Sequence, residues 1–262
     1  MTNKDIEHLS GITRITNGRR DRLELLRDFF ELSAIRISNS VDPTHFEERH
    51  NRALKTMEQY NEEELQQFGK YYLDLVSICT QNLSRGEYPD VLGRLYEQYG
   101  HIEPSSELTP HSIPEIMSYI SLDAEGQMKR NGFVELADQC CGSAVMTLRA
   151  AQILARQGLN PSNDFISFST DKNSRCINMA YIQLSLHGIP AVLSHADILT
   201  LEETDRWYTP MHLLGNWIWR RPMNHTTARN LHDERLKMIT EPMYGALRSL
   251  QWGLCDEAKE SE

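Results

Sequence analysis

The feature that most constrains the fold of this chain is a regular alternation of strand-like and helix-like segments between residues 133 and 197. Three segments are short and either apolar or alternating, as β-strands are: Phe133–Asp138, Asp164–Thr170 and Ala191–His195. Between them, residues 145–157 and 175–187 have helical patterns that stop at Gly158 and Gly188. This order predicts a parallel, doubly wound α/β sheet with right-handed crossovers.

The residues before this alternation have helical spacing almost throughout. Thr44 is the expected N-cap of a helix that runs to about Met57. Asn61 and Glu64 predict a capping box for a longer helix, and Pro89 is expected to open a short one. The sequence therefore predicts a helical region in front of the sheet.

Composition and charge exclude several classes of protein. The five cysteines form no C-x-x-C pair, and the histidines show no metal-ligand spacing, so we expect neither a disulfide framework nor a metal site. No apolar run is long enough to span a membrane and no apolar signal region begins the chain, so we expect a cytoplasmic protein.

A net charge of −10 argues against a surface covered with basic residues for nucleic-acid binding. Two local basic spots remain, Arg19-Arg20-Asp21-Arg22 and Arg220-Arg221, and either a DNA contact or an ordinary solvated surface fits them.

An acid follows or ends each of the three expected strands, namely Asp138, Asp171 and Asp197. In a parallel sheet, ligands bind beyond the carboxyl ends of the strands. The turn at Gly142 allows close backbone approach at a helix N-terminus, which suits a polar or anionic group. Asp171 is placed to accept hydrogen bonds from ribose hydroxyls, and Asp197 to accept one from an adenine amine. The alternative interpretation is that these acids only cap helices and form turns.

Several segments resemble one family in the expected order. Asp138-Gln-Cys-Cys-Gly-Ser-Ala-Val145 resembles the Asp-Pro-Ala-Cys-Gly-Ser-Gly-Gly turn of the N6-adenine DNA methylases related to type I restriction modification subunits and to short phage and plasmid relatives. Similar matches are Asp90–Glu97, Ser106–Pro110, the helix that follows Asp171, and the segment after His195. The resemblance covers roughly residues 88–220.

The resemblance implies a Rossmann-like class I sheet that binds S-adenosylmethionine, with Thr109 and Pro110 at the methionine part of that cofactor. The implied cofactor-binding residues are Thr109, Pro110, Asp138, Cys141, Gly142, Ser143, Asp171, Asn173 and Asp197. Cys140 and Cys141 either have lowered pKa values near a helix N-terminus or pack beneath the turn. Ser143 does not lie in the pattern of a hydrolase nucleophile elbow.

The chain departs from the family in the turn, where Gln139 also replaces a proline, in the Thr-Pro motif, where Leu108 replaces an aromatic residue, and in the catalytic motif. Ala144 and Val145 replace glycines of the turn, so their β-carbons are expected to narrow the cofactor space. The family's catalytic Asn/Asp-Pro-Pro-Tyr/Phe is missing, because no two prolines are adjacent. Asn216 and Trp217 are weak substitute candidates for it, since an aromatic ring there could stack a flipped base. The competing interpretation is that Trp207, Trp217 and Trp219 pack a C-terminal helix onto the sheet.

These considerations give three expected regions. Residues 1–105 form an N-terminal helical domain, 106–220 a methyltransferase-like Rossmann domain, and 221–262 a helical segment and tail. Only about 60 residues follow the third strand, whereas the missing strands and helices of a complete methyltransferase sheet need on the order of 100. We therefore expect an abridged sheet.

The leading hypothesis is a phage- or mobile-element-encoded protein of the N6-adenine DNA methyltransferase type that binds S-adenosylmethionine and has an altered catalytic half. Methyl transfer, if it occurs, is direct and depends on positioning. The alternative is a non-catalytic methylase scaffold that regulates or inhibits a restriction–modification or other defence complex, with acidic residues 53–130 meeting a basic partner. A third hypothesis changes the substrate to RNA, protein or a small molecule. A protein partner or a homo-oligomer also fits the apolar positions of the helical part.

Overall fold

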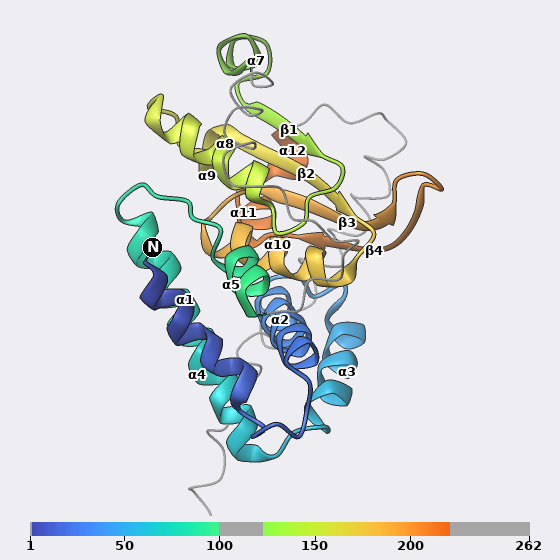
Figure 1. The fold of residues 1–262 in the computed structure, drawn as a ribbon. Helices are drawn as coiled ribbons and strands as arrows, with labels where there is room; N and C mark the ends of the chain where they lie inside the picture. The colour runs from blue at the N-terminus through green and yellow to red at the C-terminus, as the bar shows by residue number, and fades with distance from the viewer. Residues whose placement is uncertain (1, 100–122, 221–262) are drawn as a thin grey trace, which may run out of the picture.

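The computed structural model of this 262-residue chain describes residues 2–99 and 123–220. The N-terminal helices lie on one side of the molecule and the strands on the other (Figure 1). The helices of the first part are α1 (Asn3–Leu9), the 3-10 helix η1 (Ser10–Arg14), α2 (Arg22–Asn39), α3 (Phe46–Met57), α4 (Glu62–Leu83) and α5 (Val91–Tyr99). The expected helix over residues 231–250 lies outside the described residues, as does Arg221.

Side-chain caps mark where α1, α2 and α4 begin. Asn61 and Glu64 form the predicted capping box at the start of α4. The prediction for Thr44 is wrong, because α3 begins at Phe46 with His45 at the N-cap and no side-chain cap. The carboxylate of Asp42 instead accepts the Thr44 N–H at 3.1 Å, and with this turn the helix begins one residue later than expected. Similarly α5 begins at Val91 rather than at Pro89.

The second part contains one four-stranded sheet. Its elements are α7 (Ala124–Asn131), β1 (Val134–Asp138), α8 (Val145–Arg156), α9 (Pro161–Asp164), β2 (Phe165–Asp171), α10 (Ser174–Leu186), β3 (Ala191–Asp197), β4 (Glu202–Tyr208), α11 (Pro210–Leu214) and α12 (Trp217–Arg220). The spatial order is β1-β2-β3-β4, and the first three strands are parallel. The predicted α/β fold and the parallel pairing of these three strands are thus confirmed, whereas the order of the described strands does not reverse as it does in a doubly wound sheet.

Strand β4 was not predicted. It runs antiparallel to β3, with Leu193 opposite Trp207, and closes a hairpin at this edge of the sheet. Its sequence, Glu-Glu-Thr-Asp-Arg-Trp-Tyr, is largely polar, because most of its side chains remain exposed or half-exposed. Trp207 is the exception and is buried.

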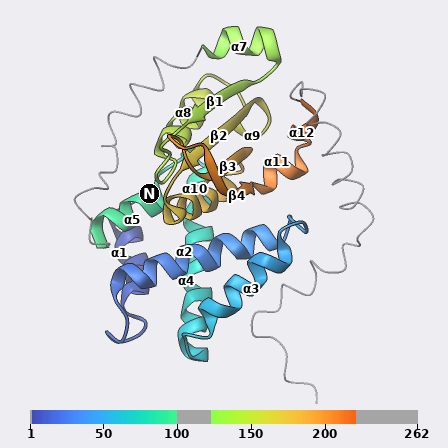
Figure 2. The ribbon, with the colours of Figure 1, turned by 90° about the vertical axis from the view of Figure 1, so that its right-hand side faces the viewer.

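One hydrophobic core joins the helical part to the sheet. In Figures 1 and 2, α10 lies between the strands and α2, and side chains of α2, α10 and β4 belong to the same buried cluster. Phe29 and Phe30 come from α2, and Tyr181 of α10 packs on Trp207 with ring centroids 4.9 Å apart. The expected domain boundaries stay a prediction. The same hydrophobic core contains residues of both the expected N-terminal helical domain and the expected Rossmann domain.

The opposite face of the sheet has a smaller cluster. Phe133, Ile166 and Trp217 are buried there, and the ring of Trp217 meets that of Phe133 edge to face at 5.3 Å. Helix α12 therefore packs onto the sheet through Trp217, while Trp207 belongs to a strand.

Candidate functional site

The parallel strands bring their carboxyl ends to one edge of the sheet. Asp138 ends β1, Asp171 ends β2 and Asp197 ends β3. The strands are staggered, so Asp138 lies opposite Ser169, whereas Asp171 lies opposite His195. Asp138 and Asp171 are close enough for their charges to interact. We call the ends of β1 and β2 together with the turn at Gly142 the β1–β2 rim.

The turn after β1 is held against the end of β2 by two backbone donors. The Cys141 N–H donates to the Thr170 carbonyl at 3.0 Å, and the Gly142 N–H donates to Asp171 Oδ2 at 3.0 Å. Gly142 has φ +52° and Ala144 φ +69°, so the turn needs the left-handed region twice in three residues. Glycine relieves this strain at the first position, while Ala144 retains it.

Asp171 ties the turn to α10 as well. Its Oδ1 accepts the Asn173 N–H at 2.9 Å, and the Asn173 side chain in turn accepts the Arg175 N–H at 3.0 Å. Asn173 is therefore the N-cap of α10. Asp171, the acid expected to bind ribose, therefore holds the turn and the start of α10 together. Each of its two oxygens has one further lone pair that can accept a hydrogen bond.

Asp138 differs from Asp171 because one of its buried oxygens is unsatisfied. Asp138 Oδ2 has no hydrogen-bond partner among the described residues. Burial raises the pKa of Asp138 to about 6, against the hydrogen bond from the Cys140 N–H and in the same direction as the nearby charge of Asp171. A buried carboxylate with a free acceptor is suited to a cationic or hydrogen-bond-donating ligand group.

Ser143 faces the interior rather than the rim. It is 1% exposed, and its hydroxyl donates to Asp90 Oδ2 at 2.9 Å. Gln183 Nε2 donates to Asp90 Oδ1 at 2.9 Å and to the Ser143 carbonyl at 2.6 Å. This buried network fixes the turn to α5 and α10. Sequence reasoning missed Asp90 and Gln183, although a glutamine on the buried face of an otherwise apolar helix was a usable signal.

The two cysteines of the turn have different surroundings. Cys140 is exposed, whereas Cys141 is buried in the main core. Burial first, and then the charges of Asp138 and Asp171, raise the pKa of Cys141 well above its ordinary value. Cys141 is therefore a protonated packing residue beneath the turn, as one of the two sequence interpretations had it.

The side chain of Ala144 does not narrow the rim in the expected way. The side chain of Ala144 is fully buried and belongs to the main core, so its methyl group points inward. Val145 is also buried. Among the described residues no side chain caps the first N–H groups of α8, which leaves donors at the rim in the position where a helix N-terminus binds polar groups.

Asp197 lies one strand further along the edge. Its Oδ1 accepts the Leu199 N–H at 2.8 Å at the start of the β3–β4 hairpin. The neighbouring His195 contacts the Lys172 carbonyl through Nε2 at 3.1 Å and Thr204 through Nδ1 at 2.8 Å. His195 also lines a groove of about 290 Å³, together with Glu48, Arg52, Ser174, Ile177, Asn178, Thr204, Asp205 and Trp207.

The remaining predicted residues fall in different places. Thr109 and Pro110 lie outside the described residues. Asn216 has φ +56°, and Trp217 is 2% exposed with the Arg220 guanidinium 4.7 Å above its ring. The ring of Trp217 is therefore already covered by Phe133 and by the guanidinium of Arg220.

The basic spots are largely occupied by contacts within the chain. Arg19 donates to Glu64 Oε2 at 2.7 Å, and Arg20 donates to Gln59 Oε1 at 2.6 Å. Arg220 donates to the Asn163 carbonyl at 2.6 Å. No group of three metal-ligating side chains occurs in residues 2–99 and 123–220, and no helix in these ranges has the length and apolar character to cross a membrane.

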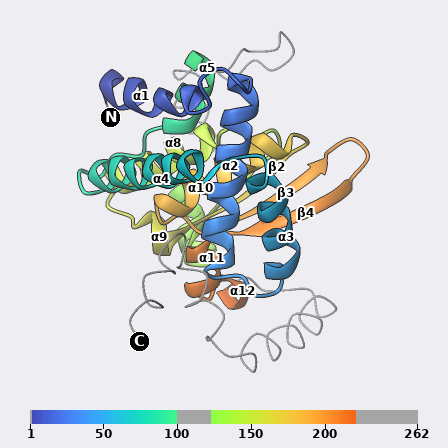
Figure 3. The same cartoon turned by 90° about the horizontal axis from the view of Figure 1, so that it is seen from below.

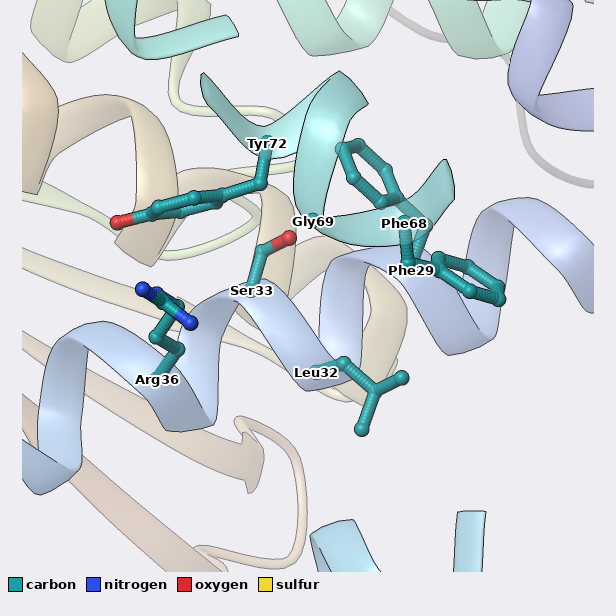
Figure 4. Close-up of a pocket in the computed structure, with 7 residues that line it drawn as sticks. All are labelled: Phe29, Leu32, Ser33, Arg36, Phe68, Gly69 and Tyr72. Atoms are coloured by element: carbon teal, nitrogen blue, oxygen red, sulfur yellow. The ribbon is translucent and has the colours of Figure 1, made fainter. Parts of the chain in front are cut away.

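A small apolar hollow lies elsewhere, where α2 and α4 cross (Figures 3 and 4). Figure 4 shows Phe29 and Phe68 on one side of it and Arg36 beside the ring of Tyr72 on the other. Its volume of about 20 Å³ holds little more than one water molecule, so it is a packing defect between two helices.

Comparisons with known proteins give two structural similarities. No protein-family model and no curated protein sequence matches the chain. Its structure is similar to that of a protein of Listeria monocytogenes assigned to the class I S-adenosylmethionine-dependent methyltransferases, with a TM-score of 0.38 and 17% identity over 73% of this chain. It is also similar to the methyltransferase subunit of a type I restriction–modification system from Streptococcus thermophilus, with a TM-score of 0.40 and 24% identity over 74% of this chain. The aligned part spans 53% of the first protein and 39% of the second.

Proposed function

We propose that the chain binds S-adenosylmethionine at the β1–β2 rim, as a protein of the N6-adenine DNA methyltransferase type. The observation that carries the proposal is the buried Asp138 Oδ2, which has no partner among residues 2–99 and 123–220 and lies beside Asp171 at the carboxyl ends of two parallel strands. The residues of the rim fit such a cofactor, because Ala144 turns its methyl group into the core and α8 presents an uncapped N-terminus.

Each acid has a separate role in this proposal. Asp138 Oδ2 would accept a hydrogen bond from the cofactor's ammonium group. That group supplies both a donor and a positive charge for the buried carboxylate. Asp171 would accept ribose hydroxyls with the lone pairs that Gly142 and Asn173 leave open. The bound cofactor supplies an electrophilic methyl group, and the protein's contribution is to hold and orient it.

The first experiment is calorimetry of the full chain with S-adenosylmethionine and with 5′-methylthioadenosine, which lacks the amino-acid part. We expect Asp138→Asn to weaken S-adenosylmethionine binding roughly tenfold or more, the scale of a charge-assisted hydrogen bond. The same variant should leave methylthioadenosine binding almost unchanged, whereas Asp171→Asn should weaken both ligands. Glu125→Gln, in an exposed pair on α7, is the matched control.

Two results would contradict the proposal: no measurable binding of either ligand, or equal loss for both ligands in Asp138→Asn. The pH dependence is a further check. As the pH falls below about 6, Asp138 takes up a proton and can no longer pair with a cation, so S-adenosylmethionine affinity should fall.

One observation favours the second candidate function, a non-catalytic methylase scaffold that regulates a defence complex. Trp217, the aromatic candidate for stacking a target base, is packed against Phe133 and beneath Arg220. A base can use that ring only after α12 moves. Transfer of a tritiated methyl group to unmethylated DNA, RNA and lysate separates the two functions: cofactor binding without transfer supports the scaffold, and transfer to DNA adenine supports the enzyme.

A further inference from the structure

A polar pocket lies away from the β1–β2 rim. Its lining residues belong to α5, α8 and the segment that joins α4 to α5, and Figure 1 shows where these elements lie. Its volume is about 370 Å³. We call it the α5–α8 pocket, and its lining residues are Glu87, Tyr88, Pro89, Asp90, Arg94, Arg149, Gln152 and Arg156. Three of the eight are arginines, in a chain whose net charge is −10.

The arginines converge from two helices. Arg149 and Arg156 lie seven residues apart on one face of α8, and Arg94 comes from α5. Arg94 Nη2 donates to Asn3 Oδ1 at 2.8 Å, which is a neutral partner. Arg149 is half-buried, and no hydrogen bond or ion pair joins it to another described residue. A cation partly withdrawn from water without a counter-charge is suited to an anionic ligand.

The carboxylates of the pocket do not neutralise it. Asp90 is buried, and its oxygens accept hydrogen bonds from the Gly93 N–H at 2.8 Å and the Ser143 hydroxyl at 2.9 Å. The carboxylate of Asp90 is therefore hydrogen-bonded to groups in the protein interior.

Glu87 is the remaining carboxylate among the lining residues. Glu87 and Arg156 each have an interaction partner, so Arg149, and Arg94 with its neutral partner, are the cations that favour an anionic ligand.

The wall of the pocket is fixed by side-chain hydrogen bonds. Gln152 Nε2 donates to the Gly86 carbonyl at 2.7 Å, and the Tyr88 N–H donates to Gln152 Oε1 at 3.1 Å. Gln183 Oε1 accepts the Val91 N–H at 2.6 Å at the other end of the same segment. The segment is held at both ends, so a ligand meets a wall that is already ordered.

We propose that the α5–α8 pocket binds a phosphate monoester. Guanidinium groups pair with phosphate oxygens through two parallel hydrogen bonds, and the volume matches a small organic ligand rather than a bare ion. Tyr88 and Pro89 supply apolar wall for the organic part. A phosphorylated metabolite and the 5′-phosphate end of a nucleic-acid strand share this chemistry. The site is independent of cofactor binding at the rim.

Calorimetry with the full chain tests the proposal. Ribose 5-phosphate is the probe and ribose its uncharged control, because neither carries an adenine that could enter the rim. We expect ribose 5-phosphate to bind, with and without saturating S-adenosylmethionine, and ribose not to bind. An oligonucleotide with and without a 5′-phosphate identifies the source: tighter binding of the phosphorylated strand than of ribose 5-phosphate assigns the site to strand ends, and weaker binding assigns it to small molecules.

Variants place the binding in this pocket. Arg149→Gln should weaken ribose 5-phosphate at least tenfold and Arg149→Lys less, whereas Arg14→Gln, an exposed arginine of η1, should have no effect. Arg156→Gln, which alters an exposed side chain, repeats the test if Arg149→Gln does not fold. The proposal is overturned if ribose 5-phosphate does not bind at millimolar concentration, or if the pocket variants and Arg14→Gln behave alike.

Discussion

At the scale of single residues, the carboxylate of Asp138 is partly buried, and its Oδ2 has no hydrogen-bond partner among the described residues. Burial raises the pKa of this group to about 6. An acid whose pKa is higher in the folded state stabilises the fold below its unfolded pKa and loses that contribution as the pH rises through the folded pKa. Ionised Asp138 therefore destabilises the protein at neutral and higher pH.

We predict that Asp138→Asn stabilises the chain at about pH 8 by roughly 1–3 kcal/mol, because the amide removes the buried charge and still accepts the Cys140 N–H. The gain should be smaller at about pH 4.5, where Asp138 is protonated in the folded protein, and it should vanish only below the unfolded pKa of about 3.9. Urea unfolding at the two pH values measures it. Glu125→Gln, in an exposed ion pair, should change the free energy of unfolding little at either pH. A stability gain that does not depend on pH would refute the role of the charge.

At the scale of secondary-structure elements, two helical glycines are expected to respond in opposite ways to alanine. A β-carbon at Gly69 of α4 meets no atom within contact distance, whereas one at Gly93 of α5 collides with the carboxylate of Asp90 and the hydroxyl of Ser143. We predict that Gly69→Ala stabilises the protein by about 0.5–1 kcal/mol through helix propensity. Gly93→Ala should destabilise it by more than 1 kcal/mol, because it disturbs the network that holds the turn.

Thermal and urea unfolding of the two alanine variants provide the measurement. The substitution is the same in both, so the difference reports the surroundings of each glycine. If Gly93→Ala left the free energy of unfolding unchanged, the buried network would not be the support of the turn that its geometry indicates.

The same scale explains which elements the sequence could predict. The parallel strands and their crossover helices have clear apolar periods and end at glycines with positive φ, Gly158 and Gly188, so local pattern was sufficient. Strand β4 was missed because its polar sequence is held in place by pairing with β3, which no local pattern encodes. The start of α3 was misplaced because Asp42 competes for the Thr44 N–H.

The candidate site was predictable in position but not in detail. The order of strands placed Asp138 and Asp171 at one edge, and the structure has both there. It could not be predicted that Ser143 turns inward to Asp90, because that contact joins residues 53 positions apart. Nor did the glycine replacements reveal that the methyl group of Ala144 points into the core.

At the scale of the whole molecule, Arg49 links the helical part to the edge of the sheet. It is 1% exposed, and its guanidinium lies 3.8 Å from the ring centre of Trp207. It donates to Asp42 Oδ2 at 3.0 Å, to Asp205 Oδ1 at 3.1 Å and to the Arg206 carbonyl at 2.8 Å. Together with the continuous core, this contact predicts that the helices and the sheet unfold as one unit.

Replacement of Arg49 by methionine tests this coupling. The variant leaves Asp42 and Asp205 without their buried counter-charge, so we expect a loss of about 3–5 kcal/mol in the free energy of unfolding. Arg49→Lys should lose less, since it keeps a charge but not the planar stacking on Trp207. Arg27→Met, which alters an exposed guanidinium beside Asp28, is the control and should cost at most about 1 kcal/mol.

Urea unfolding followed in parallel by far-ultraviolet circular dichroism and tryptophan fluorescence decides the outcome. The helical signal includes the long N-terminal helices α2 and α4, whereas two of the chain's four tryptophans, the buried Trp207 and Trp217, report the two faces of the sheet. Coincident transitions in the native chain, shifted together by Arg49→Met, are the expected result, because one hydrophobic core and one buried arginine serve both parts. Separate transitions for the two signals would mean that the helices and the sheet are independent units and that Arg49 only joins their surfaces.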